Sequence, residues 1–247
     1  MNFRRQFLLS CFAVLGLGAV SAHAQDVLRV GTDATFPPME YVEGGKRTGF
    51  DIEMVEAVGK VLNKRIEWVD IDFKGLIPGL ISKRFDMAVS AIYITDERKK
   101  VVDFTDTYYA GGLVAMVKES NTGIKTLADL NGKKVAVQVG TKSVSYLAAN
   151  HPQVQLVEVE KNQEMFNLVE IGRADAAVTG KPAAFQYVRT RGGQRVLEQQ
   201  ITTEEYGMAL RKDSSELTRS VNGALAKLKA DGTYAQIVKK WFSGSTK

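Results

Sequence analysis

Arg84-Phe85-Asp86-Met87-Ala88-Val89-Ser90-Ala91 is the stretch that decides the fold, because Arg173-Ala174-Asp175-Ala176-Ala177-Val178-Thr179-Gly180 repeats its pattern. Each copy follows a helical pattern, and a weaker echo links residues 29–33 to residues 136–142. Small, β-prone residues after a helix are common in α/β proteins, so chance resemblance is the competing interpretation. The repetition favours two similar lobes.

Apolar β-rich stretches alternate with helical patterns on both sides of the first copy. This alternation predicts an α/β protein whose sheets are mostly parallel and flanked by helices. The expected strands are residues 27–30, 66–71, 87–92 and 206–210; the expected helix faces carry Ile52, Val55, Val58 and Leu62, then Leu76, Ile77, Leu80 and Ile81, and two C-terminal helices are separated by Asp231-Gly232-Thr233.

Polar and small residues stand at the expected strand ends. Open α/β sheets bind ligands at the carboxyl ends of their strands. We therefore expect the strand-end residues of both lobes to converge on one crevice, namely Asp33, Ser90, Ala91, Thr141, Thr179 and Gly180.

Thr95-Asp96-Glu97-Arg98 could hold an anion at that crevice. Thr95 is suited to an N-cap, a helix start offers free N–H groups, and a guanidinium binds a carboxylate through two parallel hydrogen bonds. Gly140-Thr141-Lys142-Ser143 could begin a second helix facing the same carboxylate. The alternatives are a solvated charged run at residues 96–100 and a plain helix cap at Thr141.

Two aromatic residues, Phe36 and Phe73, fall in Gly- and Pro-punctuated loops after strands. They could wall the aliphatic part of a ligand or fill a satellite core under the loops. Asp33, at a strand end, would offer an acceptor.

Motifs of catalysis and metal binding are missing beyond residue 24. There is no HExxH pair, Gly-x-Ser-x-Gly elbow, Walker loop or Gly-x-Gly-x-x-Gly fingerprint, and the remaining histidine, His151, sits in an expected turn. The net charge of +5 is scattered without a basic tract, which argues against nucleic acid. We expect no catalytic residue, metal or cofactor.

The first residues read as a secretory signal peptide. Arg4 and Arg5 precede an apolar run that ends in Ala22-His23-Ala24, so cleavage near Ala24 and a periplasmic location are expected. A lipoprotein box ending at Cys11 is the alternative. Removal of residues 1–24 takes away the one cysteine and leaves about 220 residues, enough for one large or two small domains.

Several motifs resemble the polar-amino-acid-binding proteins of bacterial ABC importers (solute-binding protein family 3), glutamine-binding proteins most closely. They are residues 49–51, 73–80, Ile94-Thr95-Asp96-Glu97-Arg98, 103–109, 232–234 and 240–242. The resemblance implies the two-lobe periplasmic-binding-protein (type II) architecture, with residues 25–110 and 206–247 in one lobe and 111–205 in the other. It further implies two hinge crossings, near residues 108–112 and 202–206. It also implies a monomer that delivers a small ligand to a membrane permease.

The same resemblance implies that Arg98 and Thr141 hold the ligand α-carboxylate, that Phe36 and Phe73 enclose its aliphatic portion, and that Asp33 contacts its distal group. This chain departs from the family at four of the expected ligand-binding positions. Gly180 replaces an aspartate that neutralises the ligand ammonium, Tyr93 a small hydroxyl residue, Gln138 the lysine of glutamine binders, and Lys142 a small residue.

Loss of an acid at Gly180 and gain of a cation at Lys142 should penalise cationic ligands. The sequence therefore predicts glutamine or an acidic amino acid. A carboxylate without an amino group, a secreted lyase resembling cyclohexadienyl dehydratases, and a sensory role stay open. For the lyase, Asp33 beside Arg98 would be a poor proton donor.

Overall fold

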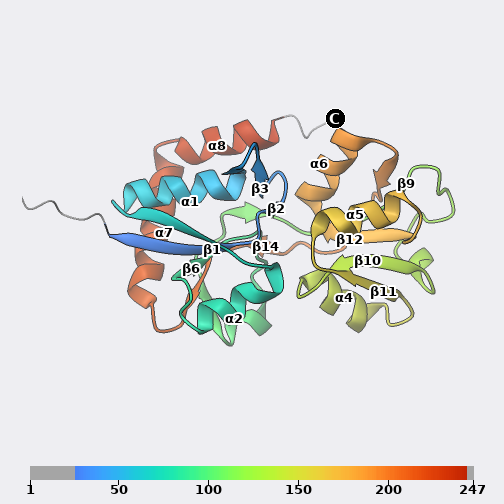
Figure 1. The fold of residues 1–247 in the computed structure, drawn as a ribbon, viewed down its shortest axis with the longest axis horizontal. Helices are drawn as coiled ribbons and strands as arrows, with labels where there is room; N and C mark the ends of the chain where they lie inside the picture. Colours follow the sequence, from blue (N-terminus) through green and yellow to red (C-terminus); the bar gives the residue numbers. More distant parts are fainter. Residues whose placement is uncertain (1–25, 244–247) are drawn as a thin grey trace, which may run out of the picture.

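The computed structural model describes residues 26–243, so the predicted signal peptide and its cleavage site lie outside the described residues. Two α/β units lie side by side along the long axis of the molecule (Figure 1). We call the unit that contains β1 the first lobe and the unit that contains β10 the second lobe. In the described part of the chain, none of the helices combines the length and the apolar character that crossing a membrane requires.

The first lobe is built on a five-stranded sheet in the order β5-β1-β6-β15-β7. β1 pairs in parallel with β5 and β6, whereas β15 runs antiparallel to β6 and β7. Its strands are β1 (Val27–Thr32), β5 (Arg65–Asp70), β6 (Met87–Ala88), β7 (Val102–Phe104) and β15 (Ala209–Arg211).

The second lobe repeats this arrangement in the order β11-β10-β12-β9-β13. β10 pairs in parallel with β11 and β12, and β9 runs antiparallel to β12 and β13. Its strands are β9 (Leu113–Lys118), β10 (Lys134–Gln138), β11 (Gln155–Val159), β12 (Ala176–Gly180) and β13 (Gln194–Val196). The matching topologies confirm the repeat. Both sheets are mixed, because one strand in each, β15 or β9, runs opposite to its neighbours.

Helices cover both sheets and bury their apolar faces against them (Figure 1). In α1, for example, Val55 and Val58 are fully buried, as their spacing predicts. The first lobe carries α1 (Phe50–Val61), η1 (Phe73–Gly75), α2 (Leu76–Ile81), α3 (Asp96–Lys99), α7 (Ser215–Ala230) and α8 (Thr233–Phe242); the second carries η2 (Ala128–Leu130), α4 (Lys142–Asn150), α5 (Asn162–Glu170) and α6 (Lys181–Arg191).

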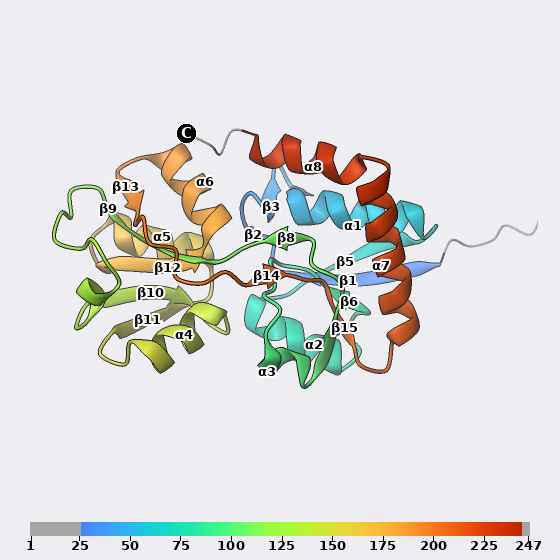
Figure 2. The ribbon, with the colours of Figure 1, turned by 180° about the vertical axis from the view of Figure 1, so that it is seen from behind.

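Two extended segments connect the lobes and lie next to each other (Figure 2). They contain β8 (Tyr109–Ala110) and β14 (Glu205–Tyr206), which pair antiparallel. The predicted hinge crossings at residues 108–112 and 202–206 fall on these segments. The lobe boundaries at residues 110 and 206 stay a prediction, because sheet membership does not fix them to a residue.

Three of the predicted elements differ in detail. Residues 87–92 are all buried, but β6 ends at Ala88 because Ala91 takes a left-handed conformation with φ of 46°. The strand expected at residues 206–210 is split between β14 and β15. In α2, Leu76 and Leu80 are buried, whereas Ile81 faces solvent.

A small antiparallel sheet, β2-β3-β4, stands between β1 and α1. It consists of β2 (Thr35–Phe36), β3 (Glu40–Glu43) and β4 (Lys46–Thr48). Phe36 therefore lies in a short strand rather than in the predicted loop. This sheet carries both Phe36 and Glu40 to the gap between the lobes.

Candidate functional site

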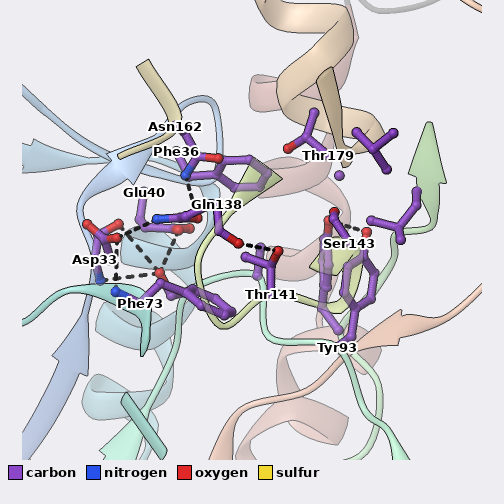
Figure 3. Close-up of a pocket in the computed structure, with 16 residues that line it drawn as sticks. Asp33, Phe36, Glu40, Phe73, Tyr93, Gln138, Thr141, Ser143, Asn162 and Thr179 are labelled. Carbon is purple, nitrogen blue, oxygen red and sulfur yellow. Dashed lines mark hydrogen bonds between the residues drawn. The ribbon is translucent and has the colours of Figure 1, made fainter. Parts of the chain in front are cut away.

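A cavity lies between the two lobes (Figure 3). Its walls come from strand ends, from the small sheet and from both connecting segments, as the strand-end argument requires. The lining residues are Asp33, Phe36, Glu40, Phe73, Ser90, Ala91, Tyr93, Leu113, Gln138, Thr141, Ser143, Asn162, Val178, Thr179, Gly180 and Tyr206.

All of the predicted ligand-binding residues except Arg98 and Lys142 line this cavity. Those two side chains border a neighbouring groove together with Gly140 and Glu204. Arg98 lies there because carbonyl oxygens accept its hydrogen bonds, and Lys142 because it pairs with Glu204 at 3.5 Å. The structure thus brings the predicted strand ends together around one cavity, whereas the expected direct lining by Arg98 and Lys142 is not observed.

Some lining residues escaped sequence reasoning: Glu40, Leu113, Ser143, Asn162, Val178 and Tyr206. Asn162 follows β11, so the strand-end rule applied to residues 155–159 would have found it. Glu40 and Tyr206 carried no local signal, because one begins a hairpin strand and the other lies on a connecting segment.

Asp33 dominates one end of the cavity. Its Oδ2 accepts hydrogen bonds from the Phe73 backbone N–H (3.1 Å) and from Gln138 Nε2 (2.9 Å). Its Oδ1 accepts from Thr35 Oγ1 (3.0 Å) and from Lys161 Nζ (3.1 Å). The carboxylate is buried, and every one of these donors stabilises its charged form.

Gln138 links Asp33 to the second lobe. Its amide also donates to the Glu160 carbonyl oxygen and accepts from Asn162 Nδ2, both at 2.9 Å. Gln138 and Asn162 are both buried, so their polar atoms need these partners. The result is a satisfied amide and carboxylate network that spans the two lobes.

Glu40 forms a second acidic feature in the wall, together with Asp51 behind it. Both carboxyl groups are buried, and each acts on the pKa of the other. Glu40 Oε2 and Asp51 Oδ1 receive no hydrogen bond from any other group in residues 26–243. One proton shared between the two carboxyl groups would give both oxygens a partner.

Burial raises both pKa values, and for Glu40 the electrostatic repulsion from Asp51 adds to this. The pKa of Glu40 lies well above its ordinary range, whereas the pKa of Asp51 is raised to about 6. Asp51 is raised less because it accepts hydrogen bonds from the Ala91 N–H (2.8 Å) and the Tyr108 hydroxyl (2.9 Å). At neutral pH Asp51 is therefore mostly ionised, whereas the raised pKa of Glu40 favours its protonated form.

The same bond to Asp51 holds Ala91 in its left-handed conformation. A non-glycine residue in this region costs roughly 1–3 kcal/mol and persists only where its surroundings enforce it. Here the enforcement comes from a buried acceptor on α1. The strain turns the chain away from β6 and brings residues 90–93 along the cavity.

Arg98 lies in the groove next to the cavity, and Thr141 lines both. Thr95 Oγ1 accepts a hydrogen bond from its backbone N–H (3.2 Å), which confirms the predicted N-cap of α3. The guanidinium donates to the carbonyl oxygens of Tyr93 (2.9 Å) and Gly140 (3.3 Å), and stands 5.6 Å from the Phe73 ring centroid. Burial lowers its pKa to about 10, so it stays cationic at neutral pH.

Arg98 forms no ion pair within residues 26–243; its hydrogen bonds go to neutral carbonyl groups of both lobes. A guanidinium has five N–H donors in a planar fork, so several donors remain for another partner. The start of α4 stands beside it, at Gly140 and Thr141. Thr141 Oγ1 donates to the Gln138 carbonyl oxygen (2.7 Å), so α4 begins as predicted but without a side-chain cap.

Gly180 faces a hydroxyl group, and this explains the missing acid. A Cβ at residue 180 would lie 2.6 Å from Tyr206 Oη and 3.0 Å from the Phe36 ring. Tyr206 Oη in turn donates to Tyr93 Oη (3.3 Å), which donates to the Gly112 carbonyl oxygen (2.8 Å). The Tyr206 hydroxyl and the Phe36 ring fill the volume that a side chain at residue 180 would need.

No cluster of three histidine, cysteine, aspartate or glutamate side chains suited to a metal ion occurs between residues 26 and 243. His151, which was expected in a turn, caps the C-terminal end of α4. Its ring lies near that of Tyr146, and it does not line the cavity. The described residues thus offer hydrogen bonds, charge and aromatic walls for a small ligand.

Residues 28–244 match the model of the bacterial extracellular solute-binding proteins, family 3. The chain belongs to this family. It is 32% identical to the ABC transporter arginine-binding protein 1 of Escherichia coli (strain K12), over 93% of this chain and 96% of that protein. It is 35% identical to the L-cystine-binding protein TcyJ of the same strain, over 87% and 82% of the two chains.

Among solved structures, this chain resembles an ancestral arginine-binding protein bound to glutamine. The TM-score is 0.84, and the identity is 41% over 89% of this chain and 99% of that chain. These relatives are named as binding proteins rather than enzymes. As a family 3 solute-binding protein, the chain binds amino acids for ABC transport. The names of these relatives include arginine, cystine and glutamine, so the relatives do not identify which amino acid this chain binds.

Proposed function

We propose that this protein is the periplasmic, monomeric receptor of an ABC importer, that it closes over an uncharged polar amino acid, L-glutamine first, and that it delivers the ligand to a membrane permease. The observation that carries the choice is that Asp33, the acid at one end of the cavity, is already neutralised by Lys161. The charge of the other cavity acid, Glu40, is suppressed by burial.

The α-carboxylate is assigned to Arg98 and the start of α4. Arg98 is a partly buried cation, and within residues 26–243 its guanidinium donates hydrogen bonds only to carbonyl groups. A ligand carboxylate would replace or join these weaker contacts with charge-assisted hydrogen bonds. The N–H groups at the start of α4 favour negative charge at the same place.

The α-ammonium is assigned to the wall formed by Glu40 and Ser90. Gly180 supplies no acid, but Asp51, behind Glu40, has a pKa of about 6 and so carries the negative charge at neutral pH. Ser90 Oγ donates to Glu40 Oε1 at 2.7 Å, so the pair reaches the cavity surface. This charge favours an amino acid over a carboxylate without an amino group.

The side chain of the ligand is assigned to the Asp33 end, between Phe36 and Phe73. Neither lysine nor arginine lines the cavity, and Lys161 is already paired with Asp33, so a second ligand carboxylate would find no free cation there. Acidic amino acids are therefore less favoured than glutamine. A cationic side chain, as in arginine, would find the acid already paired.

The test is a binding panel on the purified protein after removal of any retained ligand. Isothermal titration would compare L-glutamine, L-glutamate, L-arginine, L-cystine, L-histidine and the non-amino acid 2-oxoglutarate. The proposal expects glutamine to bind at least about tenfold more tightly than glutamate or arginine, a difference of about 1.4 kcal/mol. Preferred binding of arginine or cystine, or of 2-oxoglutarate, would refute it.

One observation favours a second function, a secreted lyase similar to cyclohexadienyl dehydratases. Glu40 is a carboxyl group in the cavity wall whose pKa is raised by burial, and a general acid requires such a raised pKa. Incubation with prephenate and detection of phenylpyruvate by absorbance tests this function directly. Turnover that disappears in Glu40→Gln would establish it; no product above the uncatalysed rate would exclude it.

A further inference from the structure

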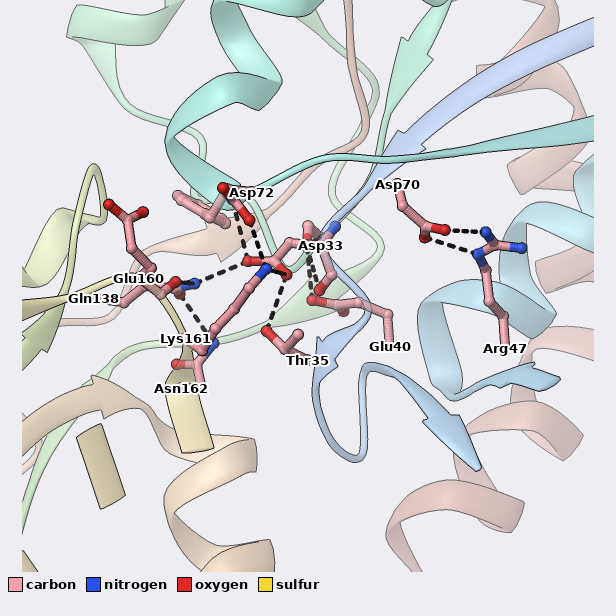
Figure 4. Close-up of polar contacts among 12 residues, drawn as sticks. Asp33, Thr35, Glu40, Arg47, Asp70, Asp72, Gln138, Glu160, Lys161 and Asn162 are labelled. Carbon is pink, nitrogen blue, oxygen red and sulfur yellow. Dashed lines mark hydrogen bonds and ion pairs between the residues drawn. The ribbon is translucent and has the colours of Figure 1, made fainter. Parts of the chain in front are cut away.

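Lys161 reaches from the second lobe to the acids of the first. It immediately precedes α5, and its Nζ lies 3.1 Å from Asp33 Oδ1 and 2.6 Å from Asp72 Oδ1 (Figure 4). The Lys161 side chain is 41% exposed, whereas the Asp33 side chain is only 3% exposed. Lys161 thus contacts the buried acid from an outer groove and does not line the cavity.

This contact completes the hydrogen bonding of Asp33. A carboxylate has about four acceptor positions. Lys161 and Thr35 occupy Oδ1, and the Phe73 N–H and Gln138 occupy Oδ2. A ligand guanidinium or ammonium would therefore have to displace one of these donors.

The contact also cancels the charge of Asp33. An acid at the end of a cavity attracts a cationic side chain only while its charge is uncompensated. Partial burial lowers the pKa of Lys161, but hydrogen bonds to Asp72 and Asp33 raise it by more, so the charged form is favoured. A ligand cation near Asp33 would meet a fixed like charge behind the carboxylate.

We propose that Lys161 determines the charge selectivity of the site by pairing with Asp33 from outside the cavity and so excluding amino acids with cationic side chains. This inference rests on the proposed function, because it explains why an uncharged side chain is preferred. It assigns selectivity to a residue that need not touch the ligand.

A purely mechanical role is the competing explanation, since Lys161 also joins the two lobes. Lys74 provides a matched control, because its Nζ forms another ion pair between the lobes, 2.5 Å from Glu160 Oε1, without contacting Asp33. Lys74→Met should weaken closure for all ligands alike. Lys161→Met should change the ratio of affinities as well.

The experiment titrates wild type, Lys161→Met and Lys74→Met with L-glutamine, L-arginine and L-lysine at low salt. We expect Lys161→Met to bind arginine or lysine at least about tenfold more tightly than wild type does, relative to glutamine. Lys74→Met should leave that ratio within about twofold. Lys161→Gln serves as a second variant should the methionine variant fail to fold, and circular dichroism checks both.

The outcomes separate the two claims. If wild type prefers glutamine and both Lys161 variants keep the wild-type ratio, the inference fails and the proposed function stands. An equal change of the ratio in Lys74→Met also refutes it. If wild type binds a different uncharged amino acid, the glutamine assignment fails and the ratio is measured against that ligand. A wild type that prefers arginine overturns both.

Discussion

The buried pair of Glu40 and Asp51 makes the stability of the first lobe depend on pH, and Asp51→Asn should remove much of that dependence. The asparagine of this variant would keep the essential contacts, because its side-chain oxygen can accept from the Ala91 N–H and the Tyr108 hydroxyl, as Asp51 Oδ2 does. Its amide nitrogen would face Glu40 Oε2, which is otherwise without a donor among the described residues. The substitution therefore changes charge with little change of shape.

The direction of the pH dependence of stability follows from how many protons the native and unfolded states bind. The pKa of Asp51 is raised from 3.8 to about 6, so between these values the native state binds more protons than the unfolded state. The free energy of unfolding then falls as pH rises through this window. At about 1.4 kcal/mol per pKa unit, the Asp51 contribution is roughly 3 kcal/mol lost between pH 4 and pH 7. Glu40, raised further, adds a loss in the same direction.

Urea unfolding at pH 4 to 8 measures this dependence. Trp68 on β5 and Trp241 on α8 both belong to the first lobe, so tryptophan fluorescence reports on the unit that contains the pair. In Asp51→Asn the loss of unfolding free energy from pH 4 to 7 should shrink by roughly 3 kcal/mol. Asp96→Asn, at a fully exposed side chain, is the control and should follow wild type. Profiles of Asp51→Asn and wild type that agree within about 1 kcal/mol would refute the reasoning.

Two further substitutions test the ends of the site. Arg98→Ala should weaken amino-acid binding at least about a hundredfold in titration calorimetry, because two charge-assisted hydrogen bonds to the ligand carboxylate are lost. Arg98→Lys should restore little of this affinity. Near-normal affinity in both variants would contradict the carboxylate assignment. Gly180→Ala should lower the free energy of unfolding by about 1–3 kcal/mol through its contact with Tyr206 Oη, and Tyr206→Phe in the same chain should relieve part of that loss. Strictly additive thermal shifts would show that the two residues do not compete for the same space.

The two-lobe fold could be predicted because its decisive signal is local and repeated. Residues 84–91 contain β6 and residues 173–180 contain β12, and each of these is the central strand of its sheet. The strands on either side of β6 and β12 have the same spatial arrangement in the two sheets. The length of β6 could not be predicted. It ends early because Asp51, far away in the chain, holds Ala91 at positive φ.

The candidate site was predicted where a strand end identifies it and missed where only a tertiary contact does. Asp33, Ser90 and Thr179 follow from the strand-end rule. The tyrosine pair at Tyr93 and Tyr206 does not, because one of its members lies on a connecting segment whose position depends on both lobes. The absence of an acid at residue 180 was visible in the sequence, but its cause was not.

Selectivity and closure are coupled at Lys161, since its ion pair with Asp33 joins groups of different lobes. The pair requires the lobes to be closed, so closure itself neutralises Asp33. A cationic ligand that kept Asp33 for itself would displace Lys161 and thereby oppose the closed state. An uncharged ligand leaves the pair intact and is enclosed with it. Because a ligand shifts a conformational equilibrium only by its differential affinity for the two states, the same contact that stabilises closure also selects the ligand.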